Sequence, residues 1–190
     1  MLLLLAACPL ALLATPTRLL APLPTPPPPR VPARHMCASV RFRPASRDDV
    51  GPIRQRMLRE LMNPLSLEHE RFLVAEDGEG ERVGFGQLRP LPDPGLWELA
   101  SLYVEKPWRR RGIGTSLVRQ LLQRHVAAGR REGHVFLLCL EPSVEWYAAL
   151  GFVPLASVAE APESMAFEIA AGGVLTRLLG ERLVCMRGRQ

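Results

Sequence analysis

The stretch of this chain best suited to chemistry is the turn from Arg109 to Gly114, RRRGIG, which joins an apolar run to a helical pattern. The apolar run from Trp97 to Val104 is typical of a buried strand. A helix is expected directly after the turn, because apolar residues recur there at helical spacing, at Ile113, Leu117, Leu121 and Leu122.

The first turn of such a helix has backbone N–H groups without intrahelical partners and carries partial positive charge. Glycines let phosphate groups approach this backbone, and arginines neutralise them. The turn from Arg109 to Gly114 is therefore predicted to bind an anion, and a diphosphate suits it best.

Charge is unevenly distributed along the chain. The sequence has 190 residues, enough for one folded domain with a tail, and a formal net charge of +5. Six arginines precede the first acidic residue, Asp48, so the rest of the chain is close to neutral. The basic balance belongs largely to the N-terminal segment and gives no case for a nucleic-acid-binding domain.

The four cysteines, Cys8, Cys37, Cys139 and Cys185, form no C-x-x-C pair and no zinc-binding spacing. Cys139 and Cys185 lie in apolar runs and are expected to be reduced core residues. No metal site is predicted.

Residues 1–36 differ in composition from the rest of the chain. They are apolar, rich in proline and free of acidic residues, which favours an extended segment outside the folded domain of residues 37–190. We interpret them as a transit peptide, for a chloroplast ahead of a mitochondrion. Two alternatives stay open: a secretory signal built on the apolar run from Leu2 to Leu13, and translation starting at Met36 to give a cytoplasmic protein. The apolar run is too short for a stable membrane span.

From about residue 39, strand and helix patterns alternate along the chain. Strands are expected at 40–43, 71–75, 83–88, 97–104, 135–140, 152–155 and 181–187. Helices are expected at 45–61, 66–70, from the glycines to about 129, 144–150 and 162–179. Gly84 and Gly86 indicate a close backbone approach within their strand. This order predicts a mixed α/β fold.

Two motifs give the chain a specific resemblance. Arg109, Gly112 and Gly114 match Arg/Gln-x-x-Gly-x-Gly/Ala, and Tyr147, Gly151 and Phe152 match Tyr-x-x-x-Gly-Phe after the following strand. With the order of elements, they resemble the GNAT (GCN5-related N-acetyltransferase) family. The resemblance implies a mixed, mostly antiparallel sheet of six to seven strands flanked by helices, with a splayed pair of parallel central strands.

The resemblance also implies that acetyl-CoA is the acyl donor. Its pyrophosphate would lie on the turn, and its pantetheine arm would pair with the strand backbone. A strand bulge would open a slot for the thioester, and a backbone N–H near Leu102 or Tyr103 would polarise the thioester carbonyl. The predicted cofactor-binding residues are Leu102, Tyr103, Val104, Arg109, Arg110, Arg111, Gly112, Ile113, Gly114, Thr115 and Ser143.

Tyr147 and Glu98 are the predicted catalytic residues. The reaction that the resemblance implies is direct attack of an amine on acetyl-CoA, with Tyr147 as general acid towards the leaving thiolate. Glu98 is the general-base candidate, because it is an acid in an otherwise apolar strand, where burial raises its pKa. The alternatives without a catalytic role are that Tyr147 is an aromatic residue of the core and that Glu98 is a structural or edge-facing acid.

The sequence departs from the family pattern where many members have an asparagine before the tyrosine. The corresponding stretch of this chain is Leu140 to Ser143, and Ser143 is the candidate to replace the asparagine. The tryptophans are expected to be packing residues, and His69, His125 and His134 to be surface or helix-cap residues.

The function predicted is N-acetyl transfer to a protein N-terminal α-amine, a lysine or a small amine, by a monomer or homodimer. The alternative is a non-catalytic acyl-CoA-binding module. A nucleotide-binding domain is disfavoured, because the turn has neither a Gly-Lys-Ser/Thr ending nor the third glycine of a dinucleotide site.

Overall fold

A seven-stranded sheet organises the protein, in the order β1-β2-β3-β4-β5-β7-β6. The computed structural model describes residues 39–64, 67–178 and 180–189. The strands are β1 (Arg41–Pro44), β2 (Phe72–Glu76), β3 (Arg82–Pro90), β4 (Trp97–Val104), β5 (Val135–Leu140), β6 (Phe152–Pro154) and β7 (Leu183–Gly188). All neighbouring strands are antiparallel except β4 and β5, which are parallel. The predicted fold class is confirmed.

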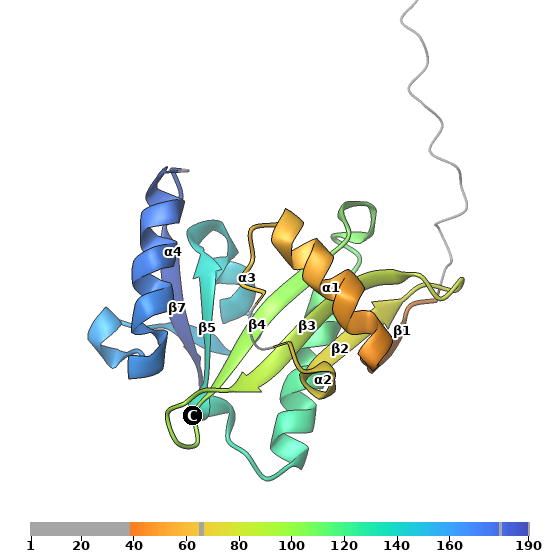
Figure 1. Cartoon of the computed structure of the whole chain (residues 1–190). Coiled ribbons are helices and arrows are strands. Elements are labelled where there is room, and N and C mark those ends of the chain that lie inside the picture. Colours follow the sequence, from red (N-terminus) through yellow and green to blue (C-terminus); the bar gives the residue numbers. More distant parts are fainter. Residues whose placement is uncertain (1–38, 65–66, 179, 190) are drawn as a thin grey trace, which may run out of the picture. The chain divides into compact units, whose positions relative to one another are not determined.

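Helices cover both faces of this sheet (Figure 1). They are α1 (Arg47–Arg59), α2 (Ile113–Ala127), α3 (Val144–Ala148) and α4 (Ala166–Leu178). Helix α1 crosses the front of the central strands, and α2 lies behind them. None of the helices in the described residues is long and apolar enough to cross a membrane.

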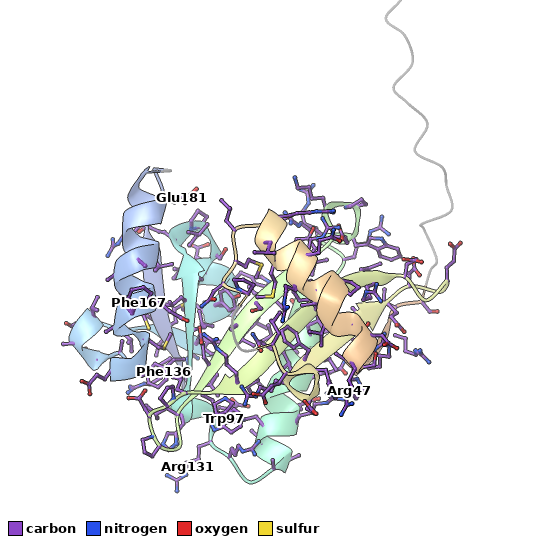
Figure 2. All side chains as sticks on the ribbon, viewed as in Figure 1. Arg47, Trp97, Arg131, Phe136, Phe167 and Glu181 are labelled. Atoms are coloured by element: carbon purple, nitrogen blue, oxygen red, sulfur yellow. The ribbon has the colours of Figure 1, made fainter. Side chains whose placement is uncertain are left out.

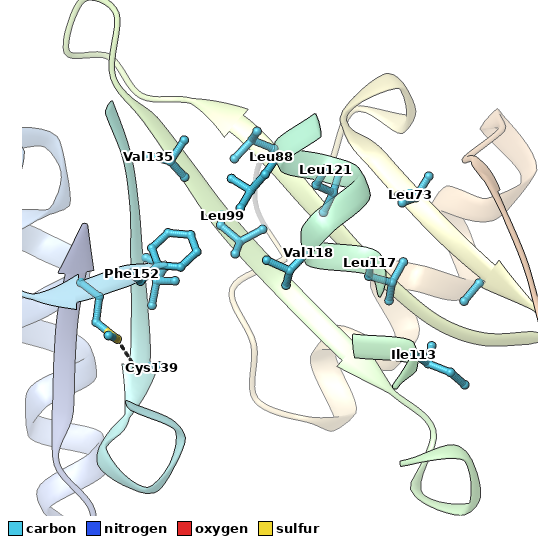
Figure 3. Packing of buried hydrophobic residues seen from close by; sticks show 14 of the residues in the cluster. Leu73, Leu88, Leu99, Ile113, Leu117, Val118, Leu121, Val135, Cys139 and Phe152 are labelled. Atoms are coloured by element: carbon cyan, nitrogen blue, oxygen red, sulfur yellow. Dashed lines mark hydrogen bonds between the residues drawn. The ribbon is translucent and has the colours of Figure 1, made fainter. Parts of the chain in front are cut away.

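Two apolar clusters fix α1 and α2 on the sheet. On the α2 face, Leu117, Val118 and Leu121 point at Leu88 and Leu99 of the strands (Figure 3). On the α1 face, a second cluster joins helix and strand residues: Ile53 and Met57 from α1, and Phe72, Phe85 and Tyr103 from the strands. Because side chains alternate along a strand, β2, β3 and β4 each contribute to both clusters.

The close approach expected at Gly84 and Gly86 is confirmed. A Cβ atom on Gly84 would lie 3.0 Å from the Tyr103 carbonyl oxygen, and one on Gly86 would lie 3.0 Å from Leu102 Cδ1 and 3.3 Å from Leu121 Cδ1. The two glycines therefore let α2 and β4 pack closely against β3.

The expected helix at 45–61 is shorter than predicted. It begins where the Asp49 carboxylate accepts a 2.7 Å hydrogen bond from the Ser46 backbone N–H, a capping contact. It ends at Arg59, and Leu58 and Leu61 are 56% and 74% exposed instead of continuing the buried stripe. Leu61 adopts φ +55°, so the chain turns away from the core at this point.

The prediction of a helix at 66–70 is wrong for residues 67–70, the part that the structure describes. Residues 65–66 lie outside the described residues, and only a single 3-10 turn, His69–Arg71, precedes β2. The acidic residues there gave no apolar stripe that could hold a helix against the sheet. The helix expected at 162–179 begins later, at Ala166, after a 3-10 turn at Glu163–Met165.

Candidate acetyl-CoA site and acceptor face

An opening between β4 and β5 forms the centre of the site. The two strands pair only at Trp97 with Val135 and at Glu98 with Phe136, and beyond these residues they diverge (Figure 1). Figure 2 shows Trp97 and Phe136 near the paired end. The unpaired lengths of both strands leave backbone N–H and C=O groups available to an extended ligand between them.

A bulge in β4 accompanies the divergence. Gln87 pairs with Ala100 and Phe85 pairs with Tyr103, so Gly86 faces both Ser101 and Leu102. Ser101 adopts φ +54°, a conformation that non-glycine residues rarely adopt. The Gln87 side-chain amide donates a 3.0 Å hydrogen bond to the Ser101 hydroxyl and braces the bulge. The splayed parallel pair and the strand bulge expected from the resemblance are both present.

The glycine turn leads into α2 as predicted. Gly112 is the N-cap residue at φ +78°, and the Ser116 N–H donates to its carbonyl at 2.9 Å, the first intrahelical bond. The N–H groups of Ile113, Gly114 and Thr115 precede this bond and have no intrahelical acceptor. Together with the helix dipole, they favour an anion at this end of α2.

Two of the three arginines contact the protein itself. The Arg109 Nε donates a 2.8 Å hydrogen bond to the Val104 carbonyl, and its guanidinium lies over the Tyr103 ring. The Arg111 guanidinium lies 5.1 Å from the centre of the Trp108 ring. Arg109 thus fixes the end of β4 relative to the turn. It also occupies one lone pair of the Val104 carbonyl, one of the backbone groups expected to pair with the cofactor.

Tyr147 lies on α3, directly after the free end of β5. Its ring contacts those of Trp146 and Phe152, with centres 4.6 Å and 6.0 Å apart. Burial, with a smaller effect of Cys139, raises the pKa of Tyr147 well above its ordinary value. The phenol therefore keeps its proton at neutral pH, and it is a weaker acid than a solvent-exposed tyrosine.

The same helix approaches the glycine turn through Trp146. A Cβ atom on Gly114 would lie 3.5 Å from Trp146 Cζ2, so this ring borders the N-terminus of α2. Ser143, the N-cap residue of α3, makes no side-chain capping bond. Trp146 and Tyr147 thus belong to the short helix that follows β5, and Tyr147 packs against the cluster on the α2 face.

Glu98 faces the opposite side of the sheet. Its neighbour Leu99 belongs to the cluster on the α2 face, so alternation directs Glu98 to the α1 face. The carboxylate is buried, and it accepts a 2.7 Å hydrogen bond from the Nε of Arg89, its cross-strand partner on β3. Burial raises the pKa of Glu98, an effect that the Arg89 charge opposes. Glu98 and Tyr147 thus lie on opposite faces of the sheet; their catalytic roles stay predictions.

Sequence reasoning missed several residues near the site: Gln87, Arg89, Ser101 and Glu168. In the sequence, Arg89 stands out only as a charged residue at the end of an apolar strand. No local pattern predicts a left-handed backbone at Ser101. His125, expected to be a surface or helix-cap residue, is 2% exposed within α2, and its ring lies 5.1 Å from the Trp97 ring, centre to centre. Cys139 and Cys185 are free thiols, and the described residues contain no group of side chains suited to a metal ion.

Comparison with known proteins places these features in context. The model of the acetyltransferase (GNAT) family matches residues 38–152. A mycothiol acetyltransferase from Mycobacterium avium is 34% identical over 120 residues, which cover 62% of this chain and 36% of the relative. An uncharacterized N-acetyltransferase from Schizosaccharomyces pombe is 32% identical over 97 residues, 49% of this chain and 60% of the relative. The chain thus matches little more than a third of the mycothiol enzyme's length.

Solved structures share the fold. An N-acetylglutamate synthase from Neisseria gonorrhoeae, complexed with coenzyme A and L-arginine, has a TM-score of 0.60 and 21% identity, covering 80% of this chain and 34% of that one. The protein Rv2747 from Mycobacterium tuberculosis, in complex with CoA and a second ligand, has a TM-score of 0.58 and 25% identity, covering 77% of this chain and 98% of that one.

Proposed function

The chain belongs to the acetyltransferase (GNAT) family, and we propose that it transfers the acetyl group of acetyl-CoA to an amine. One observation carries this proposal: the bulged strand β4 diverges from β5 directly before a glycine turn and the N-terminus of α2. A helix N-terminus suits a pyrophosphate, and two unpaired strand edges suit an amide-containing arm. The related Mycobacterium tuberculosis protein in complex with CoA supports the same donor.

In the proposed reaction, donor and acceptor approach from opposite faces of the sheet. The donor would enter from the α2 and α3 side, where Tyr147 lies, and the amine from the α1 side, where Glu98 lies. The amine nitrogen attacks the acetyl carbon, and a backbone N–H of the bulge near Leu102 stabilises the negative charge on the carbonyl oxygen. The C–S bond then breaks, Tyr147 protonates the departing thiolate, and Glu98 takes the proton that the amine loses, through water.

The alternative is a module that binds acyl-CoA without catalysis. The ion pair between Glu98 and Arg89 is the observation in its favour, because a paired carboxylate is a weaker base than a free one. Transfer activity would reject this alternative, whereas binding without transfer would support it.

Calorimetry and product analysis together test the proposal. Purified protein is titrated with CoA, then incubated with labelled acetyl-CoA and three acceptor classes: peptides with a free N-terminus, lysine peptides blocked at the N-terminus, and small amines. We expect CoA binding and an acetylated product in at least one class. No heat on CoA addition would remove the basis of the whole interpretation.

We further propose that residues 1–36 direct the protein to an organelle, a chloroplast in the first instance. Their composition supports this, and the segment lies outside the described residues. Imaging of residues 1–36 fused to a fluorescent protein tests it: a diffuse cytoplasmic signal would favour translation from Met36.

A monomer or homodimer is proposed, to be checked by light scattering.

A further inference from the structure

Helix α4 brings an additional carboxylate to the α1 side of the sheet, from which the amine acceptor is proposed to enter; this side is called the acceptor face below. The connection between β6 and β7 contains α4, and its first turn carries Glu168. The Glu168 carboxylate accepts a 2.9 Å hydrogen bond from Nη2 of Arg89 and a 3.0 Å hydrogen bond from Nδ2 of Asn63. Glu168 therefore ties α4 both to β3 and to the segment that follows α1.

Arg89 holds two carboxylates at once. Its Nη2 atom lies 2.6 Å from Glu98 Oε2 and 2.9 Å from Glu168 Oε1. Because one nitrogen contacts both oxygens, the two carboxylates lie close together. Glu168 raises the pKa of Glu98 through this proximity, in addition to the larger effect of burial.

The cluster runs from the interior to the surface. The side chains of Glu98, Arg89 and Glu168 are 6%, 12% and 28% exposed. Arg89 and Glu168 also line an open pocket of about 440 Å³, whose other lining residues include Asn63 and Arg71. Glu98 does not line this pocket, so Glu168 is the carboxylate of the cluster that an acceptor in the pocket contacts directly.

The charges around this pocket do not cancel. Two carboxylates share the single positive charge of Arg89, which leaves one negative charge. Arg71 lines the same pocket, but its Nη2 lies 2.7 Å from the Glu68 carboxylate.

On β7, the neutral thiol of Cys185 is near Glu98. Arg187 of the same strand pairs with Phe136, the β5 partner of Glu98, so it adds a second positive charge on the same face, two strands from Glu98. Beside Ser164, Asp93 adds another acid, whose carboxylate accepts a hydrogen bond from the Ser164 N–H. An ammonium group supplies the positive charge that this arrangement lacks.

We propose that Glu168 is the acceptor-recognition residue of the proposed acetyltransferase: its carboxylate accepts a hydrogen bond from the incoming ammonium group. It selects amines with neutral or cationic neighbours and rejects amines that carry a carboxylate beside the amine. The acceptor class is thus a peptide N-terminus or an amine without an adjacent acid, and free α-amino acids are disfavoured. This inference rests on the proposed function.

A matched pair of acceptors separates these possibilities. An amino-acid amide and its free amino acid, such as alanine amide and alanine, differ in the carboxylate next to the same amine. The variant Glu168→Gln keeps side-chain hydrogen bonding to Arg89 and removes the negative charge. Glu160→Gln is the matched control, since Glu160 is an exposed acid in the same connection between β6 and β7.

We expect wild-type protein to prefer the amide. Glu168→Gln should raise KM for the amide about tenfold, the size of a hydrogen bond to a charged group, and reduce its preference over the free amino acid. The KM for acetyl-CoA should not change. The acidic limb of kcat/KM should move to lower pH, because a like charge near Glu98 is removed. Glu160→Gln should match the wild type throughout.

If Glu168→Gln affects both acceptors equally, the preference for the amide over the free amino acid is unchanged, and the assignment is overturned. The same comparison is made without turnover, by titrating each acceptor into protein saturated with CoA. If the wild type acetylates no amine, the proposed function fails. The assignment of Glu168 still stands if the wild type binds the amide and the variant does not, and it falls if both bind it equally.

Discussion

Arg89 on β3 and Glu98 on β4 are direct cross-strand partners, and the Arg89 Nε donates a 2.7 Å hydrogen bond to the Glu98 carboxylate. Both side chains are largely buried beside the paired end of β4 and β5. Burial favours the neutral carboxyl and Arg89 favours the ionised form, so the pair sets how readily Glu98 takes up a proton. The relationship links the stability of the central strands to the proposed chemistry.

Replacing Arg89 by Met should therefore destabilise the protein. Removing one member of a buried ion pair leaves the other unpaired, and we expect a loss of about 3 kcal/mol in the free energy of unfolding at pH 7, measured in urea. The pKa of Glu98 should rise further, and the acidic limb of kcat/KM should move to higher pH. The double variant Arg89→Met/Glu98→Gln should recover part of the lost stability. If Arg89→Met is as stable as the wild type, the ion pair contributes nothing to the free energy of unfolding.

The two ends of α2 offer a controlled test of the glycine turn. Gly112 and Gly129 have φ +78° and +75°, and a Cβ atom on either would meet nothing within 4 Å. Alanine should cost roughly 1 kcal/mol of stability at each position, because left-handed backbone disfavours a Cβ atom. Only Gly112 adjoins the predicted pyrophosphate position, so Gly112→Ala alone should weaken CoA binding, by about tenfold if one backbone hydrogen bond to a charged group is lost.

Thermal unfolding and CoA calorimetry on both glycine variants provide the comparison. Gly129→Ala is the control for backbone strain, since it lies beyond the C-terminus of the same helix. Similar CoA affinities for the two variants would mean that the turn at Gly112 does not hold the cofactor.

The central strands could be predicted from the sequence because each is a bounded apolar run. The bounds of β4 at Trp97 and Val104, and of β5 at Val135 and Leu140, are those expected. Gly112 and Gly114 likewise marked the start of α2. In these places local composition and the tertiary environment favour the same structure.

The arrangement on the acceptor face could not be predicted in this way. The contact between Arg89 and Glu168 joins residues 79 positions apart, and it depends on where α4 packs. The left-handed backbone of Ser101 follows from the register shift between β3 and β4, which no local pattern encodes. These features arise from pairing between distant segments.

Asp49 should make the stability of the fold depend on acid pH. Its buried carboxylate contacts Arg43 at 2.7 Å, Arg82 at 3.1 Å and the Ser46 N–H at 2.7 Å. The hydrogen bond from Arg43 is the largest cause that lowers the pKa of Asp49 far below its ordinary value. A carboxylate of this kind stabilises the fold at pH values above its unfolded pKa, and this contribution is lost as the pH falls towards the folded value.

Asp49→Asn should consequently destabilise the protein by about 3 kcal/mol at pH 7, and the difference from wild type should shrink as the pH falls below about 4. Urea unfolding of both proteins between pH 7 and pH 2.5 measures this difference. A difference that stays constant over the whole range would show that the charge of Asp49 has no part in the stabilisation.

Tyr147→Phe separates catalysis from cofactor binding. The hydroxyl group is lost while the ring, with its contacts to Trp146 and Phe152, is kept. If Tyr147 protonates the thiolate, kcat should fall by about a hundredfold, a typical contribution of general-acid catalysis, and the Kd for acetyl-CoA should stay within twofold. Because burial raises the pKa of Tyr147, the wild-type kcat should not decline between pH 8 and about 9.5 through loss of this proton. Stopped-flow turnover and calorimetry measure the two quantities, and an unchanged kcat in the variant would make Tyr147 a packing residue of α3.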